Sequence, residues 1–191
     1  MIRTVVILET ERLIIRRFRA DDWQDFHEYI SSPAVLEYEP YWDTSLAAAK
    51  RTTSRFADDD SFWAVELRNS VKLIGHVYFE QIQPLQFLTW NLGYIFNPQY
   101  YGNGYATEAC NAVLKYGFEY LGVHRVEARC NPDNHRSWRL MERLAMRREG
   151  YSLKSVTFKK DGNGEPIWWD EYRYALLVDE WAGFDCECSI Q

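Results

Sequence analysis

The chain has few cysteines and no long apolar run, and each shortage excludes a class of protein. Its 191 residues include four cysteines, whose spacing fits neither a zinc site nor a disulfide framework. No apolar run is long enough to cross a bilayer or to form the core of a signal peptide. We therefore expect a cytoplasmic protein with no metal ion and no membrane partner.

Positive charge is also scarce. The chain has 22 Lys and Arg against 28 Asp and Glu, so its net charge at pH 7 is −6. Nucleic-acid binding needs a basic face, so we expect no nucleic-acid partner. An apolar content of 47% indicates a folded chain. We expect one domain over residues 1–180 and a C-terminal tail over 181–191, where Cys186 and Cys188 have no assigned role.

Apolar periodicity predicts the order of the secondary-structure elements. Period-two segments predict strands over residues 12–18, 61–67, 72–82, 90–96, 125–130, 149–158 and 167–177. Helical spacing predicts four helices, with apolar faces over 23–30, 46–56, 106–121 and 138–145. This order predicts an α/β (α+β) three-layer domain, in which a mixed, mostly antiparallel central sheet carries helices on both faces.

A glycine-rich loop, Gln99–Ala106, joins a predicted strand to the longest predicted helix. Pro98 closes the strand because proline donates no hydrogen bond to a sheet. Gly102 and Gly104 permit positive φ and let a ligand approach the backbone. The first N–H groups of the helix have no partner within it, so the loop suits a pyrophosphate.

Two common nucleotide motifs do not fit this loop. A P-loop requires Gly-Lys-Ser/Thr, but Tyr105 and Ala106 follow Gly104. A dinucleotide fingerprint requires a small residue where Thr107 stands and an acidic residue closing the next strand, which instead ends at Cys130. On the loop alone, a simple tight turn before a helix remains an alternative.

The loop resembles the acetyl-CoA loop of the GCN5-related N-acetyltransferases (GNAT), whose pattern is Gln/Arg-x-x-Gly-x-Gly/Ala. Further segments resemble the RimJ/RimL branch of that family, which acetylates the N-termini of ribosomal proteins. They follow in the family's order over roughly residues 9–177: Glu9-Thr10-Glu11-Arg12-Leu13-Ile14-Ile15-Arg16, Gly104-Tyr105-Ala106-Thr107-Glu108-Ala109, His124-Arg125-Val126-Glu127-Ala128, Asn134-His135-Arg136-Ser137, Glu142-Arg143-Leu144 and Arg148-Glu149-Gly150.

The resemblance implies the GNAT fold, acetyl-CoA as co-substrate, and direct acetyl transfer to a primary amine. It also implies that the strands beside the glycine helix splay apart and admit the pantetheine arm, with an oxyanion donor near Phe96. The residues expected to bind acetyl-CoA are Tyr94, Ile95, Phe96, Gln99, Tyr101, Gly102, Asn103, Gly104, Tyr105, Ala106, Asn134, Ser137 and Arg139. The alternative is a non-catalytic module that binds acyl-CoA on the same fold.

The leaving thiolate needs a proton donor, and hydroxyl groups are the candidates. Ser137, at the serine of the family's Asn-x-x-Ser motif, is the first candidate. It also has the residue type and position of a hydroxyl that only caps a helix. Tyr172 is the second candidate, although an aromatic residue in a strand is more often part of the core.

The attacking amine arrives as an ammonium ion and must lose a proton to a base. The family branch carries a glutamate where this chain has Asn91, so the usual base is missing. Glu80 and Asp170 are the substitutes that the sequence offers, and His76 is a further candidate because its ordinary pKa suits the task.

The acceptor amine is not identified by any motif. Glu37, Glu39 and the net charge favour a cationic acceptor, such as a protein N-terminus or a polyamine. Aromatic residues that could line its pocket are Tyr38, Trp42, Trp63, Tyr78 and Trp90. A homodimer is also compatible with the sequence, and Cys110 is expected in the core.

Overall fold

The computed structural model describes residues 6–40, 43–181 and 189–190 of the chain. Within these ranges the strands are β1 (Leu8–Glu9), β2 (Leu13–Arg17), β3 (Phe62–Leu67), β4 (Lys72–Gln81), β5 (Thr89–Phe96), β6 (Arg125–Cys130), β7 (Arg147–Lys160), β8 (Pro166–Leu177) and β9 (Ser189–Ile190). The α-helices are α1 (Trp23–Ile30), α2 (Pro33–Leu36), α3 (Leu46–Ala57), α4 (Tyr105–Tyr120) and α5 (His135–Arg143). Three short 3-10 helices are η1 (Ala20–Asp22), η2 (Leu85–Phe87) and η3 (Pro98–Tyr100).

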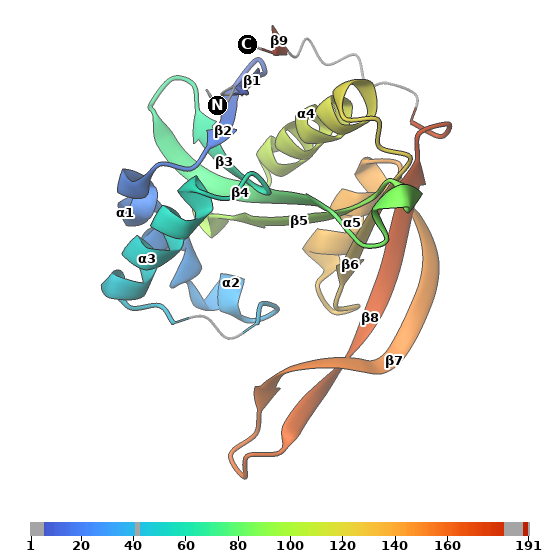
Figure 1. The fold of residues 1–191 in the computed structure, drawn as a ribbon. Coiled ribbons are helices and arrows are strands. Elements are labelled where there is room, and N and C mark those ends of the chain that lie inside the picture. Colours follow the sequence, from blue (N-terminus) through green and yellow to red (C-terminus); the bar gives the residue numbers. More distant parts are fainter. Residues whose placement is uncertain (1–5, 41–42, 182–188, 191) are drawn as a thin grey trace.

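The described strands form one sheet, in the order β7-β8-β6-β5-β4-β3-β2-β1-β9. Its neighbours are antiparallel except for β5 and β6, which pair in parallel (Figure 1). This parallel pair arises because α4 crosses from the end of β5 to the start of β6. The predicted mixed, mostly antiparallel sheet is confirmed.

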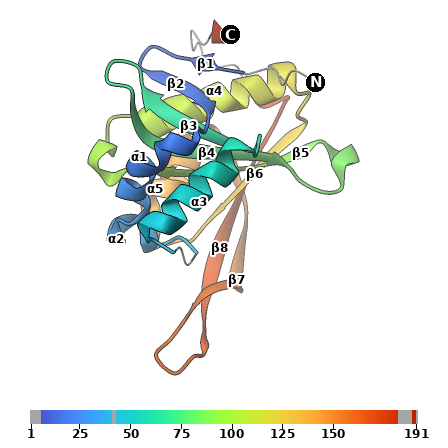
Figure 2. The ribbon, with the colours of Figure 1, turned by 60° about the vertical axis from the view of Figure 1, so that its left-hand side comes forward.

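Two apolar cores, one on each face of the sheet, account for the three layers. Successive strand residues point to opposite faces, so Trp63 and Val65 join one core and Ala64 joins the other. The larger core packs the sheet against α4 and α5, and the smaller core packs it against α1, α2 and α3. Figure 2 shows α1 and α3 on the face opposite α4.

Every strand and helix predicted from the sequence is present, and two short strands and one short α-helix were not predicted. Strands β1 and β9 pair with each other at one edge of the sheet, and α2 begins at Pro33. The single-domain boundary at residue 180 stays a prediction. Trp42, Cys186 and Cys188 lie outside the described residues, and no described helix is long and apolar enough to cross a membrane.

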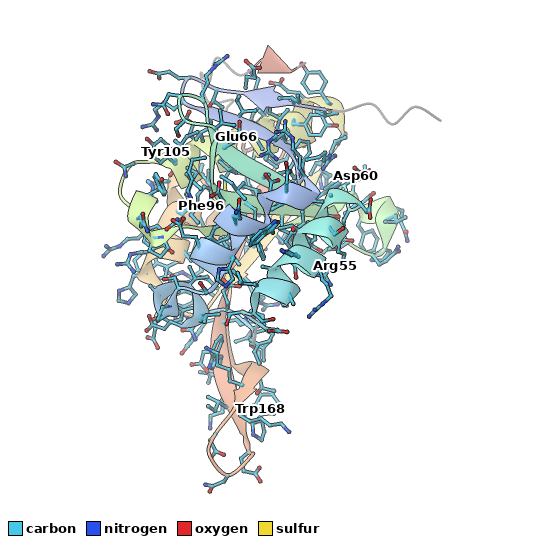
Figure 3. All side chains as sticks on the ribbon, turned by 90° about the vertical axis from the view of Figure 1, so that its left-hand side faces the viewer. Arg55, Asp60, Glu66, Phe96, Tyr105 and Trp168 are labelled. Atoms are coloured by element: carbon cyan, nitrogen blue, oxygen red, sulfur yellow. The ribbon has the colours of Figure 1, made fainter. Side chains whose placement is uncertain are left out.

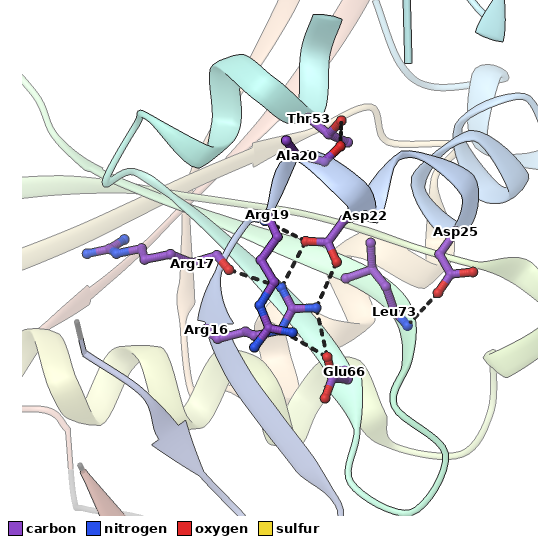
Figure 4. A network of polar contacts seen from close by, with 9 residues as sticks. All are labelled: Arg16, Arg17, Arg19, Ala20, Asp22, Asp25, Thr53, Glu66 and Leu73. Carbon is purple, nitrogen blue, oxygen red and sulfur yellow. Dashed lines mark hydrogen bonds and ion pairs between the residues drawn. The ribbon is translucent and has the colours of Figure 1, made fainter. Parts of the chain in front are cut away.

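A buried polar network fixes α1 against the sheet (Figure 4). The Arg16 guanidinium donates to Asp22 at 2.7 Å and to Glu66 at 2.7 Å, and these three side chains are 6–8% exposed. Asp25 of α1 accepts a 3.0 Å hydrogen bond from the backbone N–H of Leu73. A buried charge is tolerated only when it is paired, so removal of one partner would loosen α1 and the segment after it.

The β7–β8 hairpin projects beyond the body of the molecule (Figure 1). Figure 3 places the labelled Trp168 on this projecting arm, and 51% of its surface is exposed. The hairpin is tied to α2, because the Lys159 ammonium donates to the carbonyls of Leu36 and Glu37 at 2.6 and 3.0 Å. The arm therefore flanks the segment that follows α2.

Candidate functional site

The parallel strands β5 and β6 separate before they end. They pair over Thr89–Asn91 and Arg125–Glu127, and no pairing between them continues past these described residues. Beyond that point β5 runs beside β4 as far as Phe96, and β6 runs beside β8 as far as Cys130. The sheet therefore opens between the carboxyl ends of β5 and β6, as the family resemblance implies.

The glycine loop lies at this opening and leads into α4. Gly102 and Gly104 have φ of +80° and +81°, a backbone conformation that other residues rarely adopt. Gly104 is the N-cap of α4, and no side chain caps the helix there. The first N–H group that donates within the helix is that of Glu108, which bonds to the Gly104 carbonyl. The N–H groups of Tyr105, Ala106 and Thr107 come before it and have no carbonyl partner within α4. This uncapped helix end is suited to an anion.

A clamp from the N-terminal segment holds the loop in place. The Glu108 carboxylate accepts hydrogen bonds from the Thr10 hydroxyl at 2.6 Å and from Arg12 Nε at 2.7 Å. Arg12 also donates to the Asn103 carbonyl at 3.0 Å, and its guanidinium lies 4.7 Å from the centroid of the Tyr105 ring. Sequence reasoning missed this clamp, although Thr10, Arg12 and Glu108 all stand in segments that carry the family resemblance.

A cleft of about 1370 Å³ lies at the end of β5. Its walls come from the N-terminal segment, α2 and the residues after it, the end of β5, the glycine loop, the start of α4 and one side of α5 along its length. The residues predicted to bind acetyl-CoA that line it are Tyr94, Ile95, Phe96, Tyr101, Gly102, Gly104, Tyr105, Ala106, Asn134, Ser137 and Arg139. Eleven of the thirteen predicted residues are therefore brought together at one surface.

The two others, Gln99 and Asn103, shape the loop without lining the cleft. The backbone N–H of Gln99 donates to the Asn97 side chain at 3.1 Å, and the Gln99 side chain is exposed. The Asn103 amide donates to the carbonyls of Tyr100 and Tyr101 at 3.2 and 3.3 Å. The Asn103 side chain and the Gln99 backbone thus hold the turn, and neither residue lines the cleft.

Ser137 faces the cleft from the first turn of α5. Its Oγ lies 3.0 Å from the Tyr94 hydroxyl, which also lies 2.9 Å from the Ser137 carbonyl. Burial raises the pKa of Tyr94 well above its ordinary value, so that hydroxyl stays protonated. The cap of α5 is Asn134, whose Oδ1 accepts from the Ser137 N–H at 3.2 Å. The Ser137 hydroxyl is therefore not the cap of this helix.

Asn111 presents an unpartnered acceptor to the same cleft. Its Oδ1 is buried, and it has no hydrogen-bond partner in the part of the chain that the structure describes. A buried polar atom without a partner costs free energy, so such an atom in a cleft suits a ligand N–H group. Sequence reasoning missed Asn111, because it lies with Thr107, Glu108 and Lys115 on the polar side of α4, where an asparagine is ordinary.

Glu80, Asp170 and Tyr172 do not line the cleft. The Glu80 carboxylate is exposed and accepts a hydrogen bond from the Tyr78 hydroxyl. A hydrogen bond from Tyr151 holds the pKa of Asp170 below its ordinary value, in a second hollow beside the hairpin. The Tyr172 ring packs under the Arg148 guanidinium, 3.9 Å from its centroid. The strands thus place none of these three side chains at the cleft, where a base or a proton donor is expected.

His76 is part of the smaller core. It is 3% exposed, its Nδ1 lies 2.7 Å from the Tyr29 hydroxyl, and Phe18, Phe26 and Phe56 surround it. Burial lowers its pKa to about 3. His76 is therefore a core residue, and it does not face the cleft.

The described cysteines are unsuited to covalent catalysis. Cys110 is fully buried, as predicted, and burial raises its pKa far above the ordinary value. Burial also raises the pKa of Cys130 to about 11. A thiol is nucleophilic only as the thiolate, so neither side chain is activated.

We expect the acceptor at the end of the cleft where α2 approaches the end of β5. Tyr38 and Glu39, just after α2, line it together with Ile95 and Phe96. Among the other aromatic residues predicted there, Trp63 is 2% exposed in the core. Tyr78 bonds to Glu80, and the Trp90 ring stacks on Phe79 with centroids 4.8 Å apart. Asn91 is also absent from the cleft lining.

Comparisons with known proteins agree with this geometry. A family model described as an acetyltransferase (GNAT) domain matches residues 12–147. The uncharacterized N-acetyltransferase YnaD of Bacillus subtilis is 39% identical over 175 residues, which cover 91% of this chain and 98% of that protein. The [ribosomal protein uS5]-alanine N-acetyltransferase of Escherichia coli is 26% identical and covers 92% and 93% of the two chains. The crystal structure of a GNAT-family acetyltransferase from Bacillus anthracis superposes with a TM-score of 0.82, at 38% identity over 91% of this chain and 99% of that one.

Proposed function

Since the chain belongs to the GNAT acetyltransferase family and is an acetyl-CoA-dependent acyltransferase, we propose that it moves the acetyl group directly to a primary amine. The observation that carries this proposal is the open end of β5 and β6, beside an uncapped α4 N-terminus. The open strands leave room for an extended pantetheine arm, and the helix end offers N–H groups to its pyrophosphate.

The residues of the cleft fit acetyl-CoA in two further respects. The Asn111 carbonyl oxygen lacks a partner among the described residues, and an amide N–H of the pantetheine arm would satisfy it. Arg139 and Arg143 line the cleft from α5 and supply positive charge for phosphates. We propose that Asn134 and the backbone at Tyr94–Phe96 hold the pantetheine arm, with the thioester near Phe96.

Direct transfer needs alignment of two groups and no covalent intermediate on the protein. Alignment of the amine with the thioester accounts for about 7–11 kcal/mol of barrier reduction in well-oriented systems. A backbone N–H near Phe96, aimed at the oxyanion, would contribute roughly 3 kcal/mol more. We propose that Ser137, in contact with Tyr94, donates the proton that the leaving thiolate requires.

We propose a cationic amine as the acceptor, and a protein N-terminus as its first form. The relative that acetylates the alanine of ribosomal protein uS5 supports this choice and the RimJ/RimL branch. Glu39 and Tyr38 at the acceptor end support a cation. Both described cysteines are free thiols, which supports the expected cytoplasmic location. The homodimer stays a prediction that light scattering after gel filtration would check.

The test follows the release of free CoA thiol from acetyl-CoA in the presence of different amines. The panel holds a peptide with N-terminal alanine, the same peptide with a blocked N-terminus, and spermidine. We expect thiol release with a free amine and none with the blocked peptide. Mass spectrometry of the protein with acetyl-CoA alone should show no acetylated cysteine.

Two results would contradict the proposal. Acetyl-CoA binding without turnover on any amine would support the alternative of a non-catalytic module. A stoichiometric acetyl adduct on Cys110 or Cys130 would replace direct transfer with an acyl-enzyme, against the raised pKa of both thiols.

A further inference from the structure

Glu39 carries a carboxylate that no described protein group neutralises. It is half-buried and lies three residues after α2, where it lines the cleft with Ile95, Phe96 and Tyr101. This carboxylate makes no hydrogen bond and no ion pair with the residues that the structure describes. A half-buried charge without a partner lowers stability, so its presence in a cleft points to a function.

The groups around Glu39 leave it free to exchange a proton. Lys159 on β7 is a cation that acts on Glu39, but its ammonium donates to the carbonyls of Leu36 and Glu37. Tyr101 faces Glu39 from the glycine loop, and Arg136 of α5 acts on Tyr101. Burial raises the pKa of Glu39 to about 7, and Lys159 opposes that rise without cancelling it. A base with this pKa is half ionised near neutral pH.

The other candidate bases are excluded by their positions. Glu80 and Asp170 lie outside the cleft, His76 is buried in the smaller core, and Asn91 has no basic group. Glu39, by contrast, lies on the cleft wall near the end of β5. We propose that Glu39 is the general base that takes a proton from the acceptor ammonium, an inference that rests on the proposed acetyl transfer.

The proton and bond changes of this step balance. One proton passes from the ammonium nitrogen to the Glu39 carboxylate, and the neutral nitrogen attacks the thioester carbonyl. A C–N bond forms, and the C–S bond breaks as the tetrahedral intermediate collapses. The nitrogen loses two protons in all. One reaches Glu39 and then water, and the other ends on the CoA sulfur.

The test compares the wild type with Glu39→Gln, which keeps the size of the side chain and removes its basicity. The acceptor is the amine of the panel that turns over fastest. We expect kcat/KM at pH 7 to fall by about 10²–10⁴-fold in Glu39→Gln. Affinity for CoA, measured by calorimetry, should stay within about twofold, because Glu39 lies at the acceptor end.

The pH profile separates a base from a residue that only shapes the cleft. Wild-type kcat/KM should rise to a plateau above pH 7, where the Glu39 carboxylate is ionised. In Glu39→Gln only the neutral amine reacts, so kcat/KM should follow deprotonation of the acceptor itself. It should rise about tenfold per pH unit below the pKa of that amine, which is about 8 for a peptide N-terminus, and the inflection near pH 7 should be absent. Glu80→Gln is the matched control and should keep the wild-type profile, because the Glu80 carboxylate lies outside the cleft.

A measurement on the protein without substrate gives a second readout. Carbon NMR of the ¹³C-glutamate-labelled protein should show one carboxyl that titrates near pH 7 and is missing in Glu39→Gln. If the wild type is active and Glu39→Gln has the same rate and pH profile, the inference about Glu39 is overturned and the proposed function is not. A wild type that transfers acetyl to no amine would overturn the proposed function instead, so the two failures are distinguishable.

Discussion

Ser137 shows how a single hydroxyl acquires a role from its neighbours. Its residue type suits a helix cap, but Asn134 already caps α5, and the Ser137 Oγ contacts the Tyr94 hydroxyl at the cleft wall. The sequence motif predicted both residues as parts of the site. Their roles differ because the Asn134 side chain reaches the backbone N–H of Ser137, whereas the Ser137 side chain reaches the Tyr94 hydroxyl at the cleft wall.

The substitution Ser137→Ala tests those roles at the residue scale. We expect kcat to fall by about 10²–10⁴-fold with little change in CoA affinity, because the proton moves only in the transition state. Ser45→Ala is the matched control, since the Ser45 hydroxyl is a true cap that accepts from the Ala48 N–H of α3. It should lower the free energy of unfolding by about 0.5–2 kcal/mol and leave kcat intact. An unchanged kcat in Ser137→Ala would remove the hydroxyl from the mechanism.

At the scale of the element, the glycine loop and α4 act as one unit. The loop places the uncapped helix N-terminus at the open end of β5 and β6, and the contacts of Thr10 and Arg12 with Glu108 hold the unit to the N-terminal segment. Gly104 has a positive φ and lacks the Cβ that would cover its backbone. A side chain at this position would add strain and would also stand where the pyrophosphate is expected.

The substitution Gly104→Ala should weaken CoA binding far more than it destabilises the fold. A Cβ at Gly104 would lie 3.4 Å from the Arg12 guanidinium, beside the expected phosphate position. Gly164→Ala is the control, because Gly164 has a φ of +87° and open space around it, in the hairpin turn. Both variants should unfold at lower temperature, but calorimetry should show CoA affinity lost only in Gly104→Ala. Equal CoA affinity in the two variants would show that the loop is not the pyrophosphate site.

At the scale of the whole molecule, two titratable groups in different surroundings have opposite effects on stability. His76 lies in the smaller core, and burial lowers its pKa from 6.5 to about 3. Glu39 lies in the cleft, and burial raises its pKa from 4.5 to about 7. A folded state that binds fewer protons than the unfolded state gains stability as the pH rises, and one that binds more loses it.

The stability of the molecule should therefore respond to pH through His76. Between about pH 3 and 6.5 the unfolded chain protonates this histidine and the folded chain does not, so its contribution is present above pH 6.5 and is lost as the pH falls. In His76→Gln, which keeps an acceptor for the Tyr29 hydroxyl, that contribution is absent. Urea unfolding at several pH values gives the free energy of unfolding of both proteins. The wild-type value minus the variant value should rise from pH 4 to 7 and stay constant above pH 7. A difference independent of pH would contradict the burial of a neutral His76.

The amino-acid sequence by itself determined the features that depend on neighbours along the chain. Apolar periodicity predicted the strands and helices of the sheet, and the two glycines predicted the turn of Gln99–Ala106, because side-chain alternation and φ are local properties. Only the tertiary structure decided which polar groups face the cleft. Glu108 meets Arg12 across 96 residues of sequence, Glu39 enters the cleft, and His76 enters the core. Each of these placements, and each pKa that follows from it, depends on burial by distant segments, which no local pattern encodes.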